Sequence, residues 1–402
     1  MEKFFSNDDS VTIFNSREEL RDYNQFRKEN DRWIVTPIKN VGAYGISNLP
    51  LFIEERAKHP SVKIKGFAVP VNEIDLNNDE NKECIEDSGL FIVVETEDGY
   101  VAIPTDHRAL GSIYSRTDDY CGIMLRDRPK IQKAVLPVEE KAERITRDAA
   151  LFEGWCKILV RDGKVRYDAS QQYTITDNEE LLLTLEESLK KEHPGFTFSE
   201  GSACHEYLVA RYLINDKMQE ESLRLKLNNH GCDLHTVTSG VQFLTSDIGM
   251  SAVRANVFFV IDGKTVFLKG IAINHKDEEL EQNFKEQLRN FAKILTESED
   301  RIEELGNTDI KNVAATVKTI TENIPSVFPS TTASEVMTEL EIMYPNGGTA
   351  IDVYLALVDI VDRHCKKNDL PLARQLDLTE SVAGLIALPF DKIDTGEYKF
   401  KK

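Results

Sequence analysis

The stretch from Thr245 to Ile261, TSDIGMSAVRANVFFVI, decides the fold of the central part of this chain. Its polar first half predicts a turn, and its largely apolar second half predicts a buried strand. Arg254 and Asn256 are two positions apart in that strand, so they share one face. A guanidinium among apolar side chains needs an acceptor for its charge. We therefore expect either a site for a phosphate or carboxylate here, or a structural ion pair with an acid such as Asp247.

Two Asp-Gly pairs predict β-hairpins around this strand. Asp162-Gly163 separates two strand-like runs, and Asp262-Gly263 follows the Arg254 strand. Asp-Gly is favoured in two-residue hairpin turns because both positions need a positive φ. The pattern therefore predicts a central antiparallel sheet with hairpins. Its further strands are expected at residues 195–198, 206–214, 222–227, 242–245, 252–261 and 265–271.

The regions on either side differ in pattern. Short apolar runs separated by Gly, Pro and Asn turns predict a strand-rich N-terminal region, with a loop at Asn77–Asn81 and no helix before about residue 106. Apolar residues at helical spacing predict one long helix from Lys276 to Leu305, within a helical C-terminal third. The expected fold class is α+β, with divisions at 1–105, 106–275 and 276–402. Other helices are expected at 108–114, 138–155, 179–191, 310–323, 333–343 and 349–365.

Charge limits the classes of partner. The 402 residues include 49 lysines and arginines and 69 aspartates and glutamates, a net charge of −20 that opposes non-specific binding to nucleic acid or anionic lipid. Residues 71–100 contain ten acids and one base. Residues 121–170 have a positive balance of +3, with Arg126, Arg128, Lys130 and Lys133 close together. Only that region is expected to offer a phosphate-facing surface.

Cysteine usage and hydropathy predict a cytoplasmic protein. The six cysteines are scattered and form no Cys-x-x-Cys pair, which favours reduced thiols. The first ten residues have no apolar signal core. The chain contains no run of 18 uncharged apolar residues, so no membrane association is expected.

An ordered set of short motifs resembles a family of phage- and plasmid-borne proteins known as domain of unknown function 932. The set includes Ala109–Gly111, the Arg161–Arg166 hairpin, Ser246–Gly249 before the Arg254 strand, and Asn346–Ala350 before a helix carrying Asp362-Arg363-His364. Tyr173–Ile175 with the Asp177-Asn178 turn belongs to it as well. The resemblance covers about residues 105–370. It implies an accessory gene product of a mobile element and supplies no catalytic motif.

Arg161, Lys164 and Arg166 make the Asp162-Gly163 hairpin the most concentrated candidate for binding nucleic acid. Tyrosines are interspersed with arginines in this part of the chain, and such a surface suits a single strand, whose bases stack while its phosphates pair with cations. Arg254 and Asn256 complete the predicted nucleic-acid-binding set. Against this use of the hairpin stands the net charge of −20, which would repel a nucleic-acid strand unless the acids lie on another face. For the cluster from Arg126 to Lys133, the alternative is an ordinary solvated surface.

His230, Cys232 and His235 lie within six positions and could supply two or three zinc ligands. Their spacing is not a recurrent structural-zinc spacing, so a set of ordinary loop residues is the alternative. Asp352, Asp359 and Asp362 are placed on one face of the last clear helix, where they could meet a cation or a basic partner, or simply be solvated. The chain lacks a nucleophile elbow, an HExxH motif and a phosphate-binding glycine loop.

Two functions of different classes follow. The first is a non-enzymatic accessory protein of DNA metabolism that binds nucleic acid, single strands in particular, through the central sheet and basic hairpin. The second is an acidic interaction or anti-defence protein that binds a host or phage protein by presenting carboxylates where a nucleic acid presents phosphates. A metal-dependent enzyme is a third alternative. The sequence specifies no cofactor beyond the zinc alternative and no oligomeric state.

Overall fold

The structure is a computed structural model that describes residues 11–48, 61–70, 74–75, 78–116, 136–268 and 270–400. The fold is mixed α+β, with antiparallel sheets in the N-terminal and central regions and a mostly helical C-terminal region, as predicted. The chain forms two compact units. The first unit contains the chain up to Asn24, Thr176–Asn274 and the chain from Glu279. The second contains Gln25–Ile175 and His275–Glu278.

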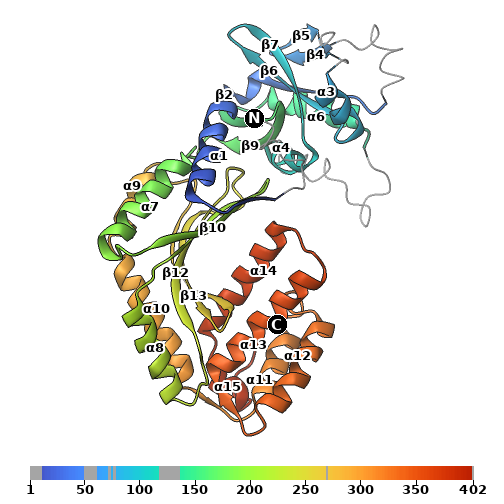
Figure 1. Cartoon of the computed structure of the whole chain (residues 1–402). Coiled ribbons are helices and arrows are strands. Elements are labelled where there is room, and N and C mark those ends of the chain that lie inside the picture. The colour runs from blue at the N-terminus through green and yellow to red at the C-terminus, as the bar shows by residue number, and fades with distance from the viewer. Residues whose placement is uncertain are drawn as a thin grey trace. The chain divides into compact units, whose positions relative to one another are not determined.

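A seven-stranded antiparallel sheet is the centre of the first unit (Figure 1). Its strand order is β1-β10-β11-β12-β13-β14, and β15 also pairs with β13. The strands are β1 (Thr12–Phe14), β10 (Thr197–Ala203), β11 (Leu208–Leu213), β12 (Val237–Thr245), β13 (Val253–Ile261), β14 (Lys264–Phe267) and β15 (Ile271–Ile273).

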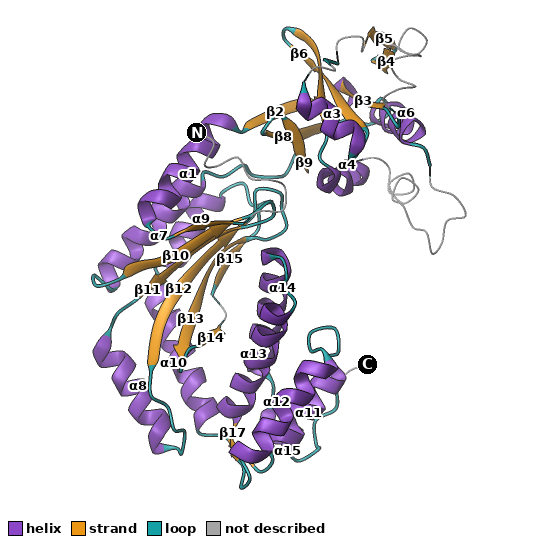
Figure 2. Ribbon diagram, turned by 45° about the vertical axis from the view of Figure 1, so that its right-hand side comes forward, coloured by secondary structure: helices purple, strands orange, loops and turns teal. Residues whose placement is uncertain are grey.

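Side chains alternate between the two faces of this sheet. Tyr212, Val241 and Val257 stand opposite one another on one face, where the main core of the unit packs. This face is covered by α7 (Asn178–Glu192), α8 (Lys217–Asn229), α9 (Leu280–Leu288) and α10 (Phe291–Gly306) (Figure 2). Leu223 and Leu227 of α8, and Phe284 of α9, are among its buried contacts.

The C-terminal helices lie on the other side of the sheet (Figures 1 and 2). The helix α13 begins with a capping box, in which Thr349 and Asp352 satisfy each other's backbone N–H groups. Tyr354 of α13 is fully buried. The helices are α11 (Val313–Asn323), α12 (Ser330–Met343), α13 (Ala350–Lys367), α14 (Leu372–Gly384) and α15 (Phe390–Asp394), and the two-residue strands β16 (Asp309–Ile310) and β17 (Gly348–Thr349) pair beside them.

The second unit contains three small antiparallel sheets, β2-β8-β9, β3-β6-β7 and β4-β5. Two apolar clusters hold it together, one around Ile92 and Ile158 and one around Phe91 and Val62. Its strands are β2 (Arg32–Pro37), β3 (Val41–Gly45), β4 (Ser61–Ile64), β5 (Phe67–Pro70), β6 (Leu90–Thr96), β7 (Gly99–Pro104), β8 (Trp155–Arg161) and β9 (Lys164–Ser170). Its helices are α3 (Asp79–Glu86), α4 (Leu110–Arg116) and α6 (Val138–Ala149), with short 3₁₀ turns at Ile38–Asn40 and His107–Ala109.

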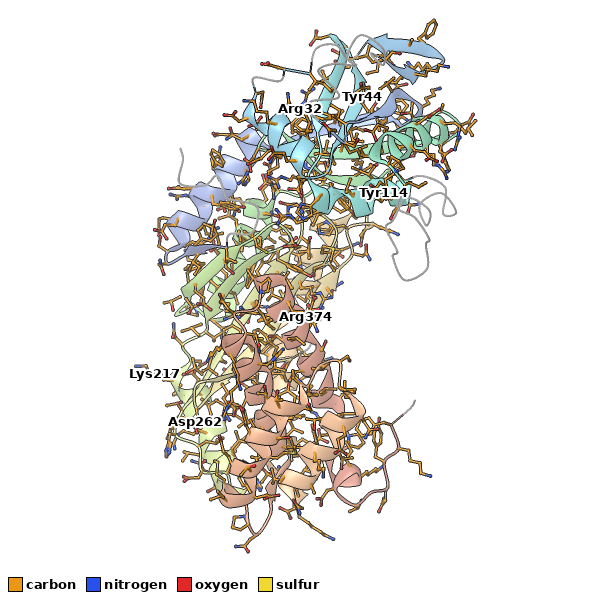
Figure 3. The ribbon with its side chains drawn as sticks, turned by 90° about the vertical axis from the view of Figure 1, so that its right-hand side faces the viewer. Arg32, Tyr44, Tyr114, Lys217, Asp262 and Arg374 are labelled. Carbon is orange, nitrogen blue, oxygen red and sulfur yellow. The ribbon has the colours of Figure 1, made fainter. Side chains whose placement is uncertain are left out.

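Both predicted Asp-Gly hairpins are confirmed. Asp162 and Asp262 have φ values of 51° and 46°, and each is followed by a glycine with a positive φ. Asp262, labelled in Figure 3, also accepts hydrogen bonds from the backbone N–H groups of His235 and Thr236. The helix predicted at 179–191 is confirmed as α7, and Asp177 caps it by accepting from the N–H groups of Glu179 and Glu180.

Several element predictions were wrong. The strand predicted at 222–227 is part of α8, which begins where Asp216 caps the N–H of Gln219. The loop predicted at Asn77–Asn81 is instead, from Asn78 onward, the cap and first turn of α3. The helix α1 (Arg17–Asn30), with residues in both units, lies in a region predicted to have no helix.

Two predicted helices are shorter than expected. The helix predicted at 138–155 ends at Ala149, and the long helix predicted from Lys276 is divided into α9 and α10 around Arg289 and Asn290. Some residues of the sequence analysis lie outside the described ranges. They are the apolar run at Leu51–Ile53, Cys121, and the four clustered cations at positions 126, 128, 130 and 133.

Gly270 should be intolerant of any side chain. A Cβ atom there would lie 1.9 Å from the carbonyl oxygen of Ala255 and 2.6 Å from the Cα of Asn256, and both are backbone atoms of β13. We expect Gly270→Ala to lower the free energy of unfolding by about 2–3 kcal/mol. Gly384→Ala is the matched control, because nothing lies within 4 Å of its position and its backbone is helical. Urea unfolding of both variants tests this, and equal stability would contradict the close approach at Gly270.

Candidate functional site

The arginines of the predicted basic hairpin are buried in a network of carboxylates. Arg161 donates from Nε and Nη2 to Oδ2 of Asp31, over 2.8 and 2.5 Å. Arg166 forms an ion pair with Asp106, and its guanidinium is also 4.0 Å from Asp162. Both arginine residues are less than a tenth exposed. These cations therefore stabilise the second unit from within and do not project from it.

Asp106 is the centre of this network. Its carboxylate also accepts from the backbone N–H and Nε of Arg108, over 2.8 and 3.3 Å. Burial by itself raises the pKa of Asp106, but the hydrogen bonds from Arg108 and the charges of Arg166 and Arg108 outweigh it. The pKa is consequently held below its usual value of 3.8. Arg27, from α1, joins the same region through a 2.9 Å ion pair with Asp162.

Lys164 at the hairpin turn is paired too. Its Nζ lies 2.5 Å from Oε2 of Glu83 on α3, and its side chain is 11% exposed. A Cβ atom built on the neighbouring Gly163 would lie 2.7 Å from the carboxylate of Glu80, so two acids of α3 approach the hairpin turn. Every member of the predicted set at this hairpin therefore has a carboxylate partner.

The predicted stripe of Arg254 and Asn256 exists and is part of a longer polar row. Cross-strand pairing aligns Glu200, Arg211, Gln242 and Asn256 across four strands. Arg211 donates to Gln242 over 2.9 Å and to Glu200 over 2.5 Å. Its guanidinium carbon also lies 5.5 Å from the centre of the Phe267 ring, a cation–π distance. The sheet face opposite the main core thus has a polar row that sequence analysis found only in part.

Arg254 pairs with Glu380 of α14 over 2.6 Å. The structural ion pair predicted as an alternative is therefore correct in kind and wrong in partner. Asp247 instead accepts from the side-chain amide of Asn178 at the start of α7. Arg254 and Glu380 keep about a third of their side-chain surfaces exposed, so this pair is much less desolvated than the pairs of the hairpin.

The residues considered for zinc are not assembled into a site. Cys232 is buried, its sulfur lies 3.7 Å from the Thr349 hydroxyl, and burial raises the pKa of its thiol. His230 and His235 are exposed. In the described parts of the chain, no group of three or more His, Cys, Asp or Glu side chains is placed to hold a metal ion.

The three aspartates of α13 have separate structural roles. Asp352 completes the capping box and accepts from the Tyr344 hydroxyl over 2.9 Å. Asp359 pairs with Arg363 over 2.8 Å. Asp362 is partly buried, and this burial raises its pKa although Lys366 lies near. They do not form one solvated acidic face.

The helix α3 and its C-cap Asp87 form the acidic helix of the second unit. Cys84 and Ile85 pack against β6 and β7, and the acidic side chains on the other sides of the helix are exposed. Those carboxylates are Asp79, Glu80, Glu83, Glu86 and Asp87. The partners within this surface are Lys82 for Asp79, Lys164 for Glu83 and His107 for Asp87.

Comparison of the chain with protein-family models, curated proteins and solved structures gave no match. The resemblance to the phage- and plasmid-borne family therefore stays a prediction. None of the helices in the described ranges is both long and apolar enough to cross a membrane.

The carboxylate partners of the hairpin were not predicted from sequence. Asp31 is 130 residues from Arg161, and Asp106 is 60 residues from Arg166. No local pattern links such positions. The sequence does contain one general signal, because an arginine among apolar strand residues needs a carboxylate partner in the folded protein.

Two arginine variants should differ sharply in stability. Arg166→Gln leaves the buried Asp106 with Arg108 as its remaining cation and without the closer one, so we expect a loss of about 3 kcal/mol in the free energy of unfolding. Arg254→Gln removes a partly exposed pair, so we expect a loss of about 1 kcal/mol or less. Urea unfolding followed by circular dichroism measures both, and similar losses would contradict this contrast.

Acid should destabilise the second unit through Asp106. A carboxyl whose pKa is lowered by folding contributes stability above its unfolded pKa of 3.8, and that contribution is lost as the pH falls through the folded value. The unfolding free energy should therefore decline below about pH 4. Asp106→Asn should be less stable at neutral pH and should lose less on acidification. An acid-dependent loss identical to that of the unmodified protein would count against this role.

Proposed function

We propose that this protein is an acidic interaction protein that binds a basic surface of another protein. The proposal rests on one observation: the cations of the Asp162-Gly163 hairpin are each held by a carboxylate of the same chain, while the acidic helix exposes its carboxylates beside them. A net charge of −20 adds long-range attraction toward a basic partner.

The basic partner most compatible with this arrangement is a lysine- and arginine-rich surface that otherwise contacts phosphates. Carboxylates on a helix present acceptor oxygens that pair with guanidinium and ammonium groups as phosphates do. Together with the resemblance to the mobile-element family, this favours an accessory or anti-defence protein that acts in the cytoplasm of a host cell. No catalytic step is part of the proposal.

Nucleic-acid binding through the hairpin has less support. A phosphate would have to displace Asp31 from Arg161 and Asp106 from Arg166, and each displacement takes the nearest cation away from a largely buried carboxylate. Lys164 would be released at lower cost, because Glu83 is largely exposed and can be solvated. One lysine supplies only a weak, salt-sensitive contact.

The first experiment measures binding to a labelled single-stranded oligonucleotide as a function of salt. We expect no binding at low salt, since the net charge repels the strand. Binding with a steep salt slope that Lys164→Gln reduces would support the nucleic-acid function and contradict the proposal. Replacing Arg161 or Arg166 by glutamate is unsuitable for this purpose, because it would add a fourth carboxylate beside Asp31, Asp106 and Asp162 and would unfold the hairpin.

A second experiment tests the acidic helix itself. Tagged protein is used to capture partners from host cells after nuclease treatment, and the captured proteins are compared with those of the variant Asp79→Asn, Glu80→Gln, Glu86→Gln. We expect a captured basic protein to be lost from the variant. The matched control is Glu187→Gln, Glu281→Gln, Glu297→Gln, which removes the same charge from exposed positions of the first unit. Equal loss in both variants would show that only net charge matters.

A further inference from the structure

The carboxyl group of Asp168 on β9 is buried where the helix α4 packs on the sheet. Asp168 is 7% exposed, and nothing in the described residues hydrogen-bonds to its Oδ1. Ile113 and Tyr114 of α4, the latter labelled in Figure 3, belong to the same apolar cluster as Val165 of β9. The Ser112 hydroxyl accepts from the backbone N–H of Asp168 over 3.0 Å. A titratable group therefore lies inside the apolar contact that holds α4.

The space beside this carboxyl group is too small to hydrate a charge. Asp168 lines a cavity of about 20 Å³, which has room for about one water molecule. An ionised carboxylate has about four positions that accept hydrogen bonds, and one water cannot occupy them all. Ionisation of Asp168 with α4 in place is therefore unfavourable. The other lining residues are Arg116, Cys156, Ile38, Val41, Ile92, Ile113, Ile145, Ala149, Ile158 and Val165.

One cation opposes this effect of burial. Arg116, at the end of α4, is the charged residue that lines the cavity with Asp168, although its Nε is buried and has no hydrogen-bond partner in the described part of the chain. Burial raises the pKa of Asp168 to about 8 in spite of this charge. From β8, the Cys156 thiol lines the same cavity and is neutral, because burial raises its pKa, and burial also raises the pKa of the adjacent Tyr167.

We propose that the contact between α4 and β9 is a pH-sensitive switch, which is closed while the Asp168 carboxyl keeps its proton. In the closed state the neutral carboxyl is tolerated among aliphatic side chains. When α4 moves away from β9, water reaches the carboxyl, which then ionises as an ordinary aspartate does and releases its proton. This inference is independent of the acidic-helix function and concerns a different part of the second unit.

The direction of the pH dependence follows from the two protonation states. The pKa of Asp168 is about 8 in the closed state, against the ordinary value of 3.8 in the open state. Below about pH 4 both states are protonated, and the closed state has its full stability. Between about pH 4 and pH 8 only the open state has lost the proton, so the equilibrium constant for opening rises about tenfold per pH unit. Above about pH 8 both states are ionised and the constant is level. A rise in pH therefore loosens α4.

The first test measures opening by hydrogen exchange of the α4 amides, followed by mass spectrometry between about pH 5 and pH 7 and corrected for the intrinsic exchange rate. In the unmodified protein we expect the equilibrium constant for opening to rise about tenfold per pH unit. Asp168→Asn has no proton to release and should give a constant that does not change with pH. Glu143→Gln, which removes an exposed carboxyl of α6, is the control and should keep the slope. A level profile in the unmodified protein, or an equal slope in Asp168→Asn, would overturn the proposal.

The second test follows the carboxyl carbon of Asp168 by ¹³C NMR in the unmodified protein, so it holds even where a variant does not fold. We expect a titration midpoint near pH 8. Arg116→Gln removes the opposing charge and should move the midpoint to higher pH. A midpoint near the ordinary value would show that the closed state already holds a carboxylate, which would overturn the proposal. A midpoint that is unchanged or lower in Arg116→Gln would also overturn it, because the guanidinium would then not face Asp168.

Discussion

Guanidinium groups that lose their water need carboxylates, and this requirement joins distant parts of the chain in both units. In the first unit, Arg17 pairs with Glu179 and Glu186, more than 160 residues away. In the second, Arg161 pairs with Asp31 across 130 residues. The net stabilisation from such a buried pair is small, but removing one partner is costly because the other charge is left buried without compensation. Each partner therefore has to lie next to the other in the folded protein.

The same pairing explains how the charge is distributed. Arg27, Arg161 and Arg166 are buried in the second unit against Asp31, Asp106 and Asp162, while many other acids of the chain are left at the surface. The acidic helix α3 is the clearest case, because its apolar side is only Cys84 and Ile85 and its other positions are mostly charged. The cations of the Asp162-Gly163 hairpin therefore add little positive charge to the surface, because carboxylates of the same chain hold them.

Sequence analysis predicted the fold class, the two hairpins and the helix α7, because these depend on neighbouring residues. It failed at Ser222–Leu227, where the leucines at 223, 225 and 227 alternate as they would in a strand. In the helix that forms, Leu223 and Leu227 are buried one turn apart and Leu225 is 49% exposed. Asp216, seven residues before Leu223, was the overlooked capping signal. The polar row across β10–β13 was found only at Arg254 and Asn256, since register between strands cannot be determined from one strand alone.

The pairing of β1 with β10 has a consequence for the order of synthesis. Thr12 lies opposite Ala203, so the first strand of the large sheet leaves the ribosome almost two hundred residues before the strand with which it pairs among the described residues. Most of the second unit is synthesised between these two strands, and its local hairpins can form before β1 has a partner strand. The large sheet is therefore a late product of translation, and a nascent chain stalled before β10 would expose the unpaired edge of β1 to chaperones or to other chains.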